Sequence, residues 1–251
     1  MSREQSLNKT IAQIWEDKYV VPLYQRNFSW TEEQIGQLLQ DLYDNAPKSQ
    51  DDQCGNYYLG ALVVLERKDG IWEVIDGQQR LTCLHFICKY LNILKKPCLT
   101  YDSRPEVESF FADLFVKSWN DFIHEYNRID NSKISRLKDA LRIVENFKIR
   151  TGKGDENITL KEMTPEQRNL LAEYISSKVI LVRIPLPQDT DVASYFEIMN
   201  NRGEQLQSYE IVKAMLMQGL NDRDRNIFAT IWDGCSQMNQ PIQQTLSYYR
   251  A

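Results

Sequence analysis

The octapeptide Ile75–Thr82 has the residue types and spacing of an anion-binding turn. An alternating β-branched run precedes it, and from Leu81 onward apolar residues recur at helical spacing, so the octapeptide should lie between a strand and a helix. Gly77 permits a tight turn and a close backbone approach. The first N–H groups of a helix attract anions, and Arg80 adds a charged fork beside them. This combination is suited to holding a phosphate group.

A structural role explains part of the same turn equally well. Asp76 is a favoured helix N-cap, and Gln79, three residues later, would complete a capping box. A cap does not account for Gln78 and Arg80, which lie beside these two residues. Taken alone, the turn is as compatible with a structural cap as with an anion site.

A second candidate site lies in the loop at residues 24–30. Aromatic rings can stack on a base, and an arginine can fork onto a phosphate or a guanine. The candidate residues in this loop are Tyr24, Gln25, Arg26 and Trp30. The alternative is a loop whose aromatic side chains fill the core.

A third candidate site lies at the end of a helix that we expect near residues 191–200. Asn200 and Arg202 are polar groups at the C-terminus of this helix, and Lys213 on the following helix could join them. The alternative is a C-cap at Gly203 with positive charge that complements the helix dipole.

Composition limits the class of protein. The chain has 251 residues, of which 42% are hydrophobic and 26% charged, as in ordinary globular proteins. No apolar run reaches the roughly 18 residues of a membrane span, so no membrane partner is expected. The polar N-terminus shows no signal peptide, and the five cysteines include no C-x-x-C pair. These features predict reduced thiols and a cytoplasmic protein.

The net charge of −5 argues against broad, non-specific coating of DNA. It leaves room for a local basic groove, because the 30 lysines and arginines can cluster. Basic residues lie off the apolar stripe of a helix expected near residues 134–147. They favour a solvated helix face over a DNA-binding arm.

Strand and helix patterns indicate how the candidate sites are positioned. The buried strand 57–65 and the strand 72–75 are separated by a hairpin signal at residues 68–70. From about residue 95 to 177 helical patterns dominate, and strand character returns at residues 179–184. We expect this last strand to join the same sheet as the first two.

Three stretches taken together resemble a known family. They are Tyr24-Gln25-Arg26 with Trp30, Asp76-Gly77-Gln78-Gln79-Arg80-Leu81-Thr82, and Asn200-x-Arg202-Gly203-x-x-Leu206 with Ile211-Val212-Lys213. In this order they are similar to the N-terminal domain of GmrSD-type restriction endonucleases, a domain of the ParB/sulfiredoxin-like superfamily. Glu210, where the family usually has Asp, is a conservative departure.

The resemblance implies an α+β fold: a small mixed sheet of the ParB/sulfiredoxin-like type with a large helical insertion. Residues 1–94 would form the first part of the ParB-like core and residues 95–177 the helical insertion. Residues 178–251 would supply the return strand and the helices that complete the core. The family's nuclease is usually a separate C-terminal His-Asn-His domain, and His85 and His124 lack that spacing. We therefore expect the chain to stop before such a domain.

The resemblance also implies binding and hydrolysis of a nucleoside triphosphate, with Mg²⁺, in a phage-defence system that restricts modified DNA. The catalytic candidates are Asp76, Gln78, Gln79 and Arg80, with Asp76 as the candidate ligand of Mg²⁺. The nucleotide-binding candidates are Gly77, Arg80, Asn200, Arg202 and Lys213. The DNA-binding candidates are Tyr24, Gln25, Arg26 and Trp30. The implied partners are DNA and a nuclease domain or subunit.

Two alternatives remain open at this point. One is a module that senses modified DNA without hydrolysing nucleotide. The other is a ParB-like clamp that nucleotide closes on DNA, which would form a homodimer when nucleotide binds. In all three cases we expect Tyr24–Arg26, Asp76–Arg80 and Asn200–Arg202 to line one polar cleft with Lys213 at its rim.

Overall fold

The computed structural model describes residues 7–152 and 156–192, followed by the shorter pieces 195, 212–213, 216–217, 220, 224–225, 227–229 and 231–232. The chain divides into two compact units. The first comprises Met1–Pro22 and Asn27–Gln188, and the second comprises Leu23–Arg26 and Asp189–Ala251. The elements named below belong to the first unit.

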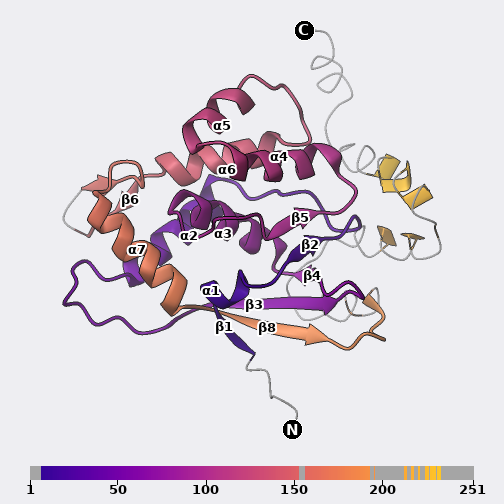
Figure 1. Ribbon diagram of the computed structural model, residues 1–251, viewed down its shortest axis with the longest axis horizontal. Helices are drawn as coiled ribbons and strands as arrows, with labels where there is room; N and C mark the ends of the chain where they lie inside the picture. Colours follow the sequence, from indigo (N-terminus) through magenta and orange to yellow (C-terminus); the bar gives the residue numbers. More distant parts are fainter. Residues whose placement is uncertain are drawn as a thin grey trace. The chain divides into compact units, whose positions relative to one another are not determined.

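A mixed six-stranded sheet is the base of the first unit (Figure 1). Its strand order is β1-β8-β3-β4-β2-β5. The strands are β1 (Asn8–Thr10), β2 (Tyr19–Val21), β3 (Tyr57–Glu66), β4 (Trp72–Asp76), β5 (Leu99–Tyr101) and β8 (Val179–Leu186). Strands β1 and β8 are antiparallel, as are β3 and β4, and the remaining neighbours are parallel. The expected α+β class with a mixed sheet is therefore confirmed.

The hairpin and the returning strand are confirmed as well. Strands β3 and β4 pair antiparallel around a turn in which Gly70 adopts a φ of +77°. Strand β8 pairs in parallel with β3, with Val182 opposite Ala61. Two edge strands of the sheet were not expected from the sequence. Residues 8–10 form β1, and β5 joins the sheet although helical patterns dominate residues 95–177.

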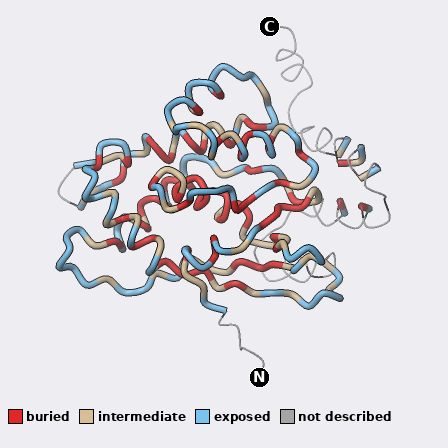
Figure 2. Tube along the Cα trace, in the orientation of Figure 1, coloured by how far each residue is buried: buried red, intermediate tan, exposed pale blue. Residues whose placement is uncertain are grey.

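Helices cover one side of the sheet, above it in Figure 1. They are α2 (Glu32–Asn45), α3 (Gln78–Tyr90), α4 (Pro105–Val116), α5 (Trp119–Tyr126) and α6 (Ser135–Asn146). A short helix α1 (Ile11–Ile14) contacts α7 (Pro165–Lys178), and a small hairpin is formed by β6 (Ile149–Arg150) and β7 (Asn157–Ile158). Residues buried along α3 place it in the core, between the sheet and α6 (Figure 2).

Local sequence explains where two of the helices begin. Thr31 precedes α2, and its N–H donates to Gln34 Oε1 at 2.9 Å in a capping box. Thr164 precedes α7 in the same way, with its N–H donating to Gln167 Oε1 at 2.8 Å, and Pro165 occupies the first turn. Each cap satisfies backbone donors that the helix itself leaves without partners.

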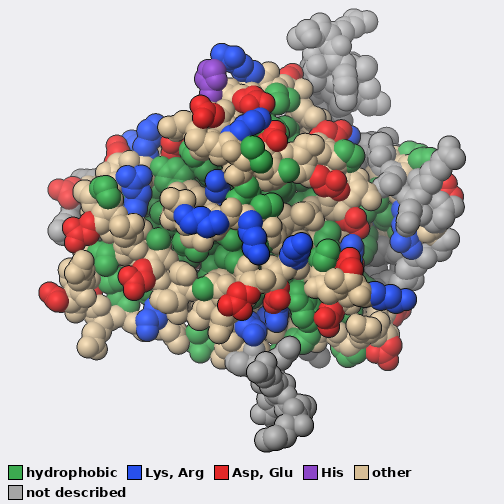
Figure 3. Space-filling model, viewed as in Figure 1, with side chains coloured by type: hydrophobic (Ala, Val, Ile, Leu, Met, Phe, Trp, Pro, Cys, Tyr) green, Lys and Arg blue, Asp and Glu red, His purple; other side chains and the backbone are tan. Residues whose placement is uncertain are grey.

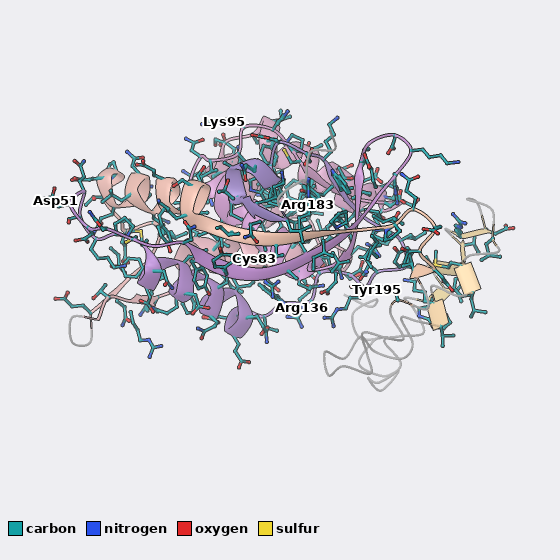
Figure 4. The ribbon with its side chains drawn as sticks, turned by 90° about the horizontal axis from the view of Figure 1, so that it is seen from below. Asp51, Cys83, Lys95, Arg136, Arg183 and Tyr195 are labelled. Carbon is teal, nitrogen blue, oxygen red and sulfur yellow. The ribbon has the colours of Figure 1, made fainter. Side chains whose placement is uncertain are left out.

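Arg183 on β8, labelled in Figure 4, braces the sheet. Arg183 is 6% exposed as a residue. Its guanidinium donates to the Asp17 carboxylate and to the Tyr19 hydroxyl at 3.1 Å, and lies 4.6 Å from the centre of the Trp72 ring. Burial raises the pKa of Tyr19 to about 12, so its hydroxyl stays neutral beside the arginine. These contacts of Arg183 link β8 with β4 and β2, and neither strand is a neighbour of β8 in the sheet.

His85 is fully buried in the middle of α3 and packs against aromatic rings. The ring centroids of Phe111 and Phe115 lie 5.3 Å and 5.1 Å away. Its Nε2 accepts the Cys98 N–H at 3.4 Å, and its Nδ1 has no hydrogen-bond partner among the described residues. Burial lowers the pKa of His85 to about 3. These surroundings are those of a structural histidine.

The buried His85 makes stability depend on pH in a defined window. The pKa of His85 in the folded chain lies below its value in the unfolded chain. Between these two pKa values the imidazole is protonated in the unfolded chain and neutral in the folded chain. Stability is therefore complete above pH ~6.5 and falls as the pH drops toward about 3, by about 1.4 kcal/mol per pH unit from this group. We expect His85→Leu to flatten the dependence of the unfolding free energy on pH in this window.

Urea denaturation at stepped pH values measures this effect. The matched control is His124→Leu, which removes the chain's other histidine from an exposed position. Equal pH dependence in the His85 variant and the parent chain would show that the buried imidazole does not carry the effect.

Candidate functional site

The turn between β4 and α3 is built on Gly77. Its φ of 93° and ψ of 8° place it in the left-handed region, and it is the N-cap of α3. A Cβ at this position would lie 3.1 Å from the carbonyl oxygen of Ala61 on β3. Gly77 therefore satisfies both a left-handed turn and a close approach between two backbones.

The alternative of a capping box formed by Asp76 and Gln79 was wrong. Asp76 is the last residue of β4, one position before the N-cap. The Gln79 side chain bonds to another loop and not to the backbone of the turn. The left-handed glycine brings the helix start close to β3, and the cap position falls on a residue without a side chain.

The first turn of α3 presents backbone N–H groups that the helix does not use. The first intrahelical bond of α3 runs from Leu81 N–H to Gly77 O at 2.9 Å, so the amides of residues 78–80 point out of the helix start. Asp76, Gly77 and Arg80 are partly exposed, whereas Gln78 and Gln79 are buried. A partly exposed helix start with an arginine beside it is the arrangement that favours an anion.

Arg80 lies flat against a bulge in β3. Its Nη1 donates to Ala61 O at 3.2 Å. Pairing of β3 with β8 shifts register between Tyr58 and Gly60, and Gly60 has a φ of +127°. A Cβ on Gly60 would lie 3.0 Å from Arg80 Nη1, so the missing side chain makes room for the guanidinium. The bulge in β3 thus sets the position of the motif arginine.

Gln79 ties the helix start to Asn27 and Ser29, which lie within the loop at residues 24–30. Its Oε1 accepts the Ser29 N–H at 2.8 Å, and its Nε2 donates to Asn27 O at 3.2 Å. Both ends of this amide are therefore occupied by one loop. The side chain is 6% exposed, which makes these bonds hard to replace with water.

Thr82 and Tyr101 support the same turn from the core. The Thr82 hydroxyl donates to Gln78 O at 2.8 Å and lies 2.8 Å from the Tyr101 hydroxyl on β5. Burial raises the pKa of Tyr101 to about 12, and its ring stacks on Phe111 at 5.6 Å between centroids. The first turn of α3 is thus held by β3, by β5 and by the loop at residues 27–29.

The structure places the remaining candidates only in part. Tyr24, Gln25 and Arg26 belong to the second unit, as does Lys213, and Gln25 and Lys213 are buried. Trp30, in the first unit, is partly buried and packs against the core. Asn200 and Arg202 lie outside the described residues. The shared polar cleft therefore stays a prediction.

Sequence reasoning missed four residues that shape the turn: Gly60, Ala61, Asn27 and Ser29. An isolated glycine inside a strand pattern is a signal of a bulge, and Gly60 within the apolar run of β3 carries that signal. The other three act through backbone atoms. Nothing in a side-chain pattern reports a carbonyl or an amide that turns toward another element.

The candidate metal site is sparse. Among the residues that the structure describes, no group of three or more His, Cys, Asp and Glu side chains converges on one point. Asp76, partly exposed at the end of β4, is the single acidic member of the motif. Mg²⁺ is often held by one or two carboxylates together with substrate phosphates, so this residue fits a metal that arrives with a triphosphate.

The fold and the turn define an α+β domain in which a buried helix presents an arginine-bearing start beside a mixed sheet. The family described as GmrSD restriction endonuclease, N-terminal domain, matches residues 6–217. Because this match covers most of the chain, the protein belongs to that family and is a component of a restriction endonuclease system. The resemblance seen in the motifs is confirmed. A search of curated proteins found no match, and no described helix is long and apolar enough to span a membrane.

The bulge at Gly60 provides a direct test of how Arg80 is positioned. In Gly60→Ala a Cβ would meet Arg80 Nη1 and Cζ at 3.0 Å and 3.3 Å, on a backbone that L-residues avoid. We expect a loss of about 1–3 kcal/mol in the free energy of unfolding, measured by urea denaturation.

Two controls separate the causes of that loss. Gly70→Ala also has a positive φ, of +77°, but meets nothing within 4 Å, so it reports backbone strain alone. Gly55→Ala meets nothing within 4 Å either. If Gly60→Ala cost no more than Gly70→Ala, contact with Arg80 would not be what requires the glycine.

The Gln79 tether predicts a local change in dynamics. Gln79→Leu keeps the size of the buried side chain and removes both bonds to the loop. We expect faster hydrogen exchange at the Ser29 amide, by roughly tenfold for each 1.4 kcal/mol lost. Mass-spectrometric exchange of the peptide that contains Ser29 measures it. The peptide around Gln34, whose bond is to Thr31, is the internal reference, and equal protection of Ser29 in both proteins would contradict the tether.

Proposed function

We propose that the turn at Asp76–Arg80 binds the phosphates of a nucleoside triphosphate. On this proposal the domain is the nucleotide-binding and nucleotide-hydrolysing regulatory part of a restriction system that acts on modified DNA. The observation that carries the proposal is the partly exposed helix start with Arg80 beside it, in a chain of the GmrSD family. As part of the same proposal, the fold is of the ParB/sulfiredoxin-like type.

Each residue of the turn has a role in this proposal. The outward amides of residues 78–80 and the Arg80 guanidinium hold phosphate oxygens, because both supply N–H donors where negative charge accumulates. Asp76 is the acidic group beside them, and Gln78 orients the attacking water. Gln79 positions the loop at residues 27–29, since both ends of its amide are already bonded there.

The Arg80 guanidinium can serve both structure and ligand. A guanidinium has five N–H donors, and Ala61 O takes one of them at 3.2 Å. Its contact with Gly60 fixes one face of the group against β3. An arginine held in this way loses little conformational freedom when a phosphate binds.

Mg²⁺ fits the proposal as a partner of the nucleotide. When bound, it would neutralise charge on the phosphate oxygens, and Asp76 is the residue of this turn that would hold it. Beyond nucleotide, the proposed partners are DNA, which Tyr24, Gln25, Arg26 and Trp30 would contact, and a nuclease domain or subunit. Asn200, Arg202 and Lys213 complete the proposed nucleotide site.

The decisive assay is nucleotide hydrolysis across all nucleoside triphosphates, with and without plain or modified DNA. Hydrolysis that depends on an intact turn supports the enzyme. Nucleotide binding without turnover favours a ParB-like clamp, and nucleotide-dependent dimerisation distinguishes it. If the chain binds modified DNA but has no affinity for nucleotide, the result favours the module that senses modified DNA without hydrolysis.

Arg80 is the residue to change first. Arg80→Ala removes a charged donor, and a hydrogen bond to a charged group contributes about 1.5–3 kcal/mol. We expect triphosphate affinity to fall roughly tenfold or more, measured by calorimetric titration. Arg80→Gln is the companion variant, because its amide can still reach toward Ala61 O while the charge is lost.

Arg136→Ala is the matched control, because Arg136 is exposed and forms no ion pair with a described residue. Both Arg80 variants must keep the melting temperature of the parent chain within a few degrees for the comparison to count. A folded Arg80 variant that binds triphosphate as tightly as the parent would rule out this anion site.

A further inference from the structure

A cluster of lysines surrounds the far end of α3, away from the motif turn. Lys89 lies in the last turn of α3, and Lys95 and Lys96 lie in the loop that leads to β5. Lys18 directly precedes β2, where the Tyr19 N–H donates to Cys98 O at 2.8 Å. That bond brings the start of β2 against the end of the loop. We call Lys18, Lys89, Lys95 and Lys96 the lysine surface.

Some lysine side chains elsewhere in the first unit are paired with carboxylates, whereas these four are not. Lys133 lies 2.6 Å from Glu106, and Lys117 lies 2.7 Å from Glu125. None of the four members of the lysine surface forms an ion pair with a described residue. Of the carboxylates adjacent to Lys18 in sequence, Asp17 is bonded to Arg183, and Glu16 is exposed.

Electrostatic effects within the cluster agree with this crowding. The pKa of Lys89 is lowered, first by partial burial and then by repulsion from Lys95. Burial raises the pKa of Cys98, and the charges of Lys96 and Lys18 oppose that rise. Lys96 and Lys18 therefore lie close enough to the Cys98 thiol for their charges to affect its pKa. Like charges gathered on one surface create a local positive potential that attracts an anionic partner, even on a chain of net charge −5.

Packing and the helix dipole explain the position of only one residue of the lysine surface, Lys89. Lys89 lies in the last turn of α3, where the dipole favours a cation, and its ammonium lies 5.0 Å from the centre of the Phe115 ring. Lys18, Lys95 and Lys96 are exposed, and none of them is in a helix. Figure 3 shows lysine and arginine side chains gathered in a band over α3, β5 and β2. Lys95 and Arg136 point to opposite sides of the unit in Figure 4.

The lysine surface is separate from the motif turn. Helix α3 has 13 residues, so its two ends are about 20 Å apart at 1.5 Å per residue. An anion at Gly77 and a partner on the lysine surface would therefore occupy different places on one rigid helix. A ligand of the lysine surface would therefore bind apart from one at the motif turn, so the two sites can be tested separately.

We infer that the lysine surface binds the phosphate backbone of duplex DNA, independently of base sequence. The partner must be anionic and extended, because the charges come from three segments spread along a surface. Lysine is a point charge on a flexible stem, which suits phosphate contacts that carry no sequence information, whereas arginine forks suit base edges. The surface positions DNA on the domain, and recognition of a modification lies elsewhere.

The test compares two triple variants that change net charge equally. One is Lys89→Gln, Lys95→Gln and Lys96→Gln, within the lysine surface. The other is Lys68→Gln, Lys148→Gln and Lys178→Gln, which removes three exposed lysines from separate places in the fold. Affinity for a short unmodified duplex is measured by fluorescence anisotropy at several salt concentrations. Calorimetric titration of each protein with triphosphate runs in parallel.

We expect the surface variant to bind DNA roughly tenfold or more weakly at low salt, and the slope of log affinity against log salt to decrease by about 2 to 3. The scattered variant should keep the parent's slope. Triphosphate affinity should be equal in all three proteins, which separates this result from any failure of the nucleotide site. Equal DNA affinity in the two variants, or no DNA binding by the parent chain, would overturn the inference.

If the surface variant melts below the parent, Lys95→Gln with Lys96→Gln replaces it. Both residues are exposed and outside the helices, so this pair should leave the fold intact. The double variant should then decrease the salt slope by about 1 to 2. A double variant with the parent's slope would overturn the inference as well.

Discussion

Burial of α3 is the constraint on which the rest of the first unit depends. The helix lies in the core along most of its length, so its polar first turn must find partners in protein rather than in water. Ala61 O on β3 accepts from Arg80, the Asn27–Ser29 loop holds Gln79, and Tyr101 on β5 meets Thr82. Three parts of the chain are thereby fixed around one helix start.

Burial of α3 also limits which residues of the turn a ligand can contact. Gln78 and Gln79 are buried, whereas Asp76, Gly77 and Arg80 remain partly exposed. A ligand at this turn would meet donors whose positions are already set by the bulge at β3. Preorganised donors bind an anion with a smaller loss of conformational freedom than mobile ones.

The two ends of α3 have opposite structural settings. Its start is surrounded by backbone and amide partners, and its end opens onto lysines without carboxylate partners among the described residues. A rigid, buried helix keeps these two regions at a fixed separation.

Sequence by itself determined the class of fold, the pairing of β3, β4 and β8 in one sheet, and membership of the GmrSD family. Apolar periodicity is a local signal that predicted the strands, and the short motifs carried the resemblance that implied the fold class and the family. Only the tertiary structure decided that Gly77 and not Asp76 is the cap, that Gln79 bonds to the loop at residue 29, and that β5 joins the sheet. Those outcomes depend on backbone groups of distant segments, and a backbone carbonyl or amide is the same in every sequence until the fold places it.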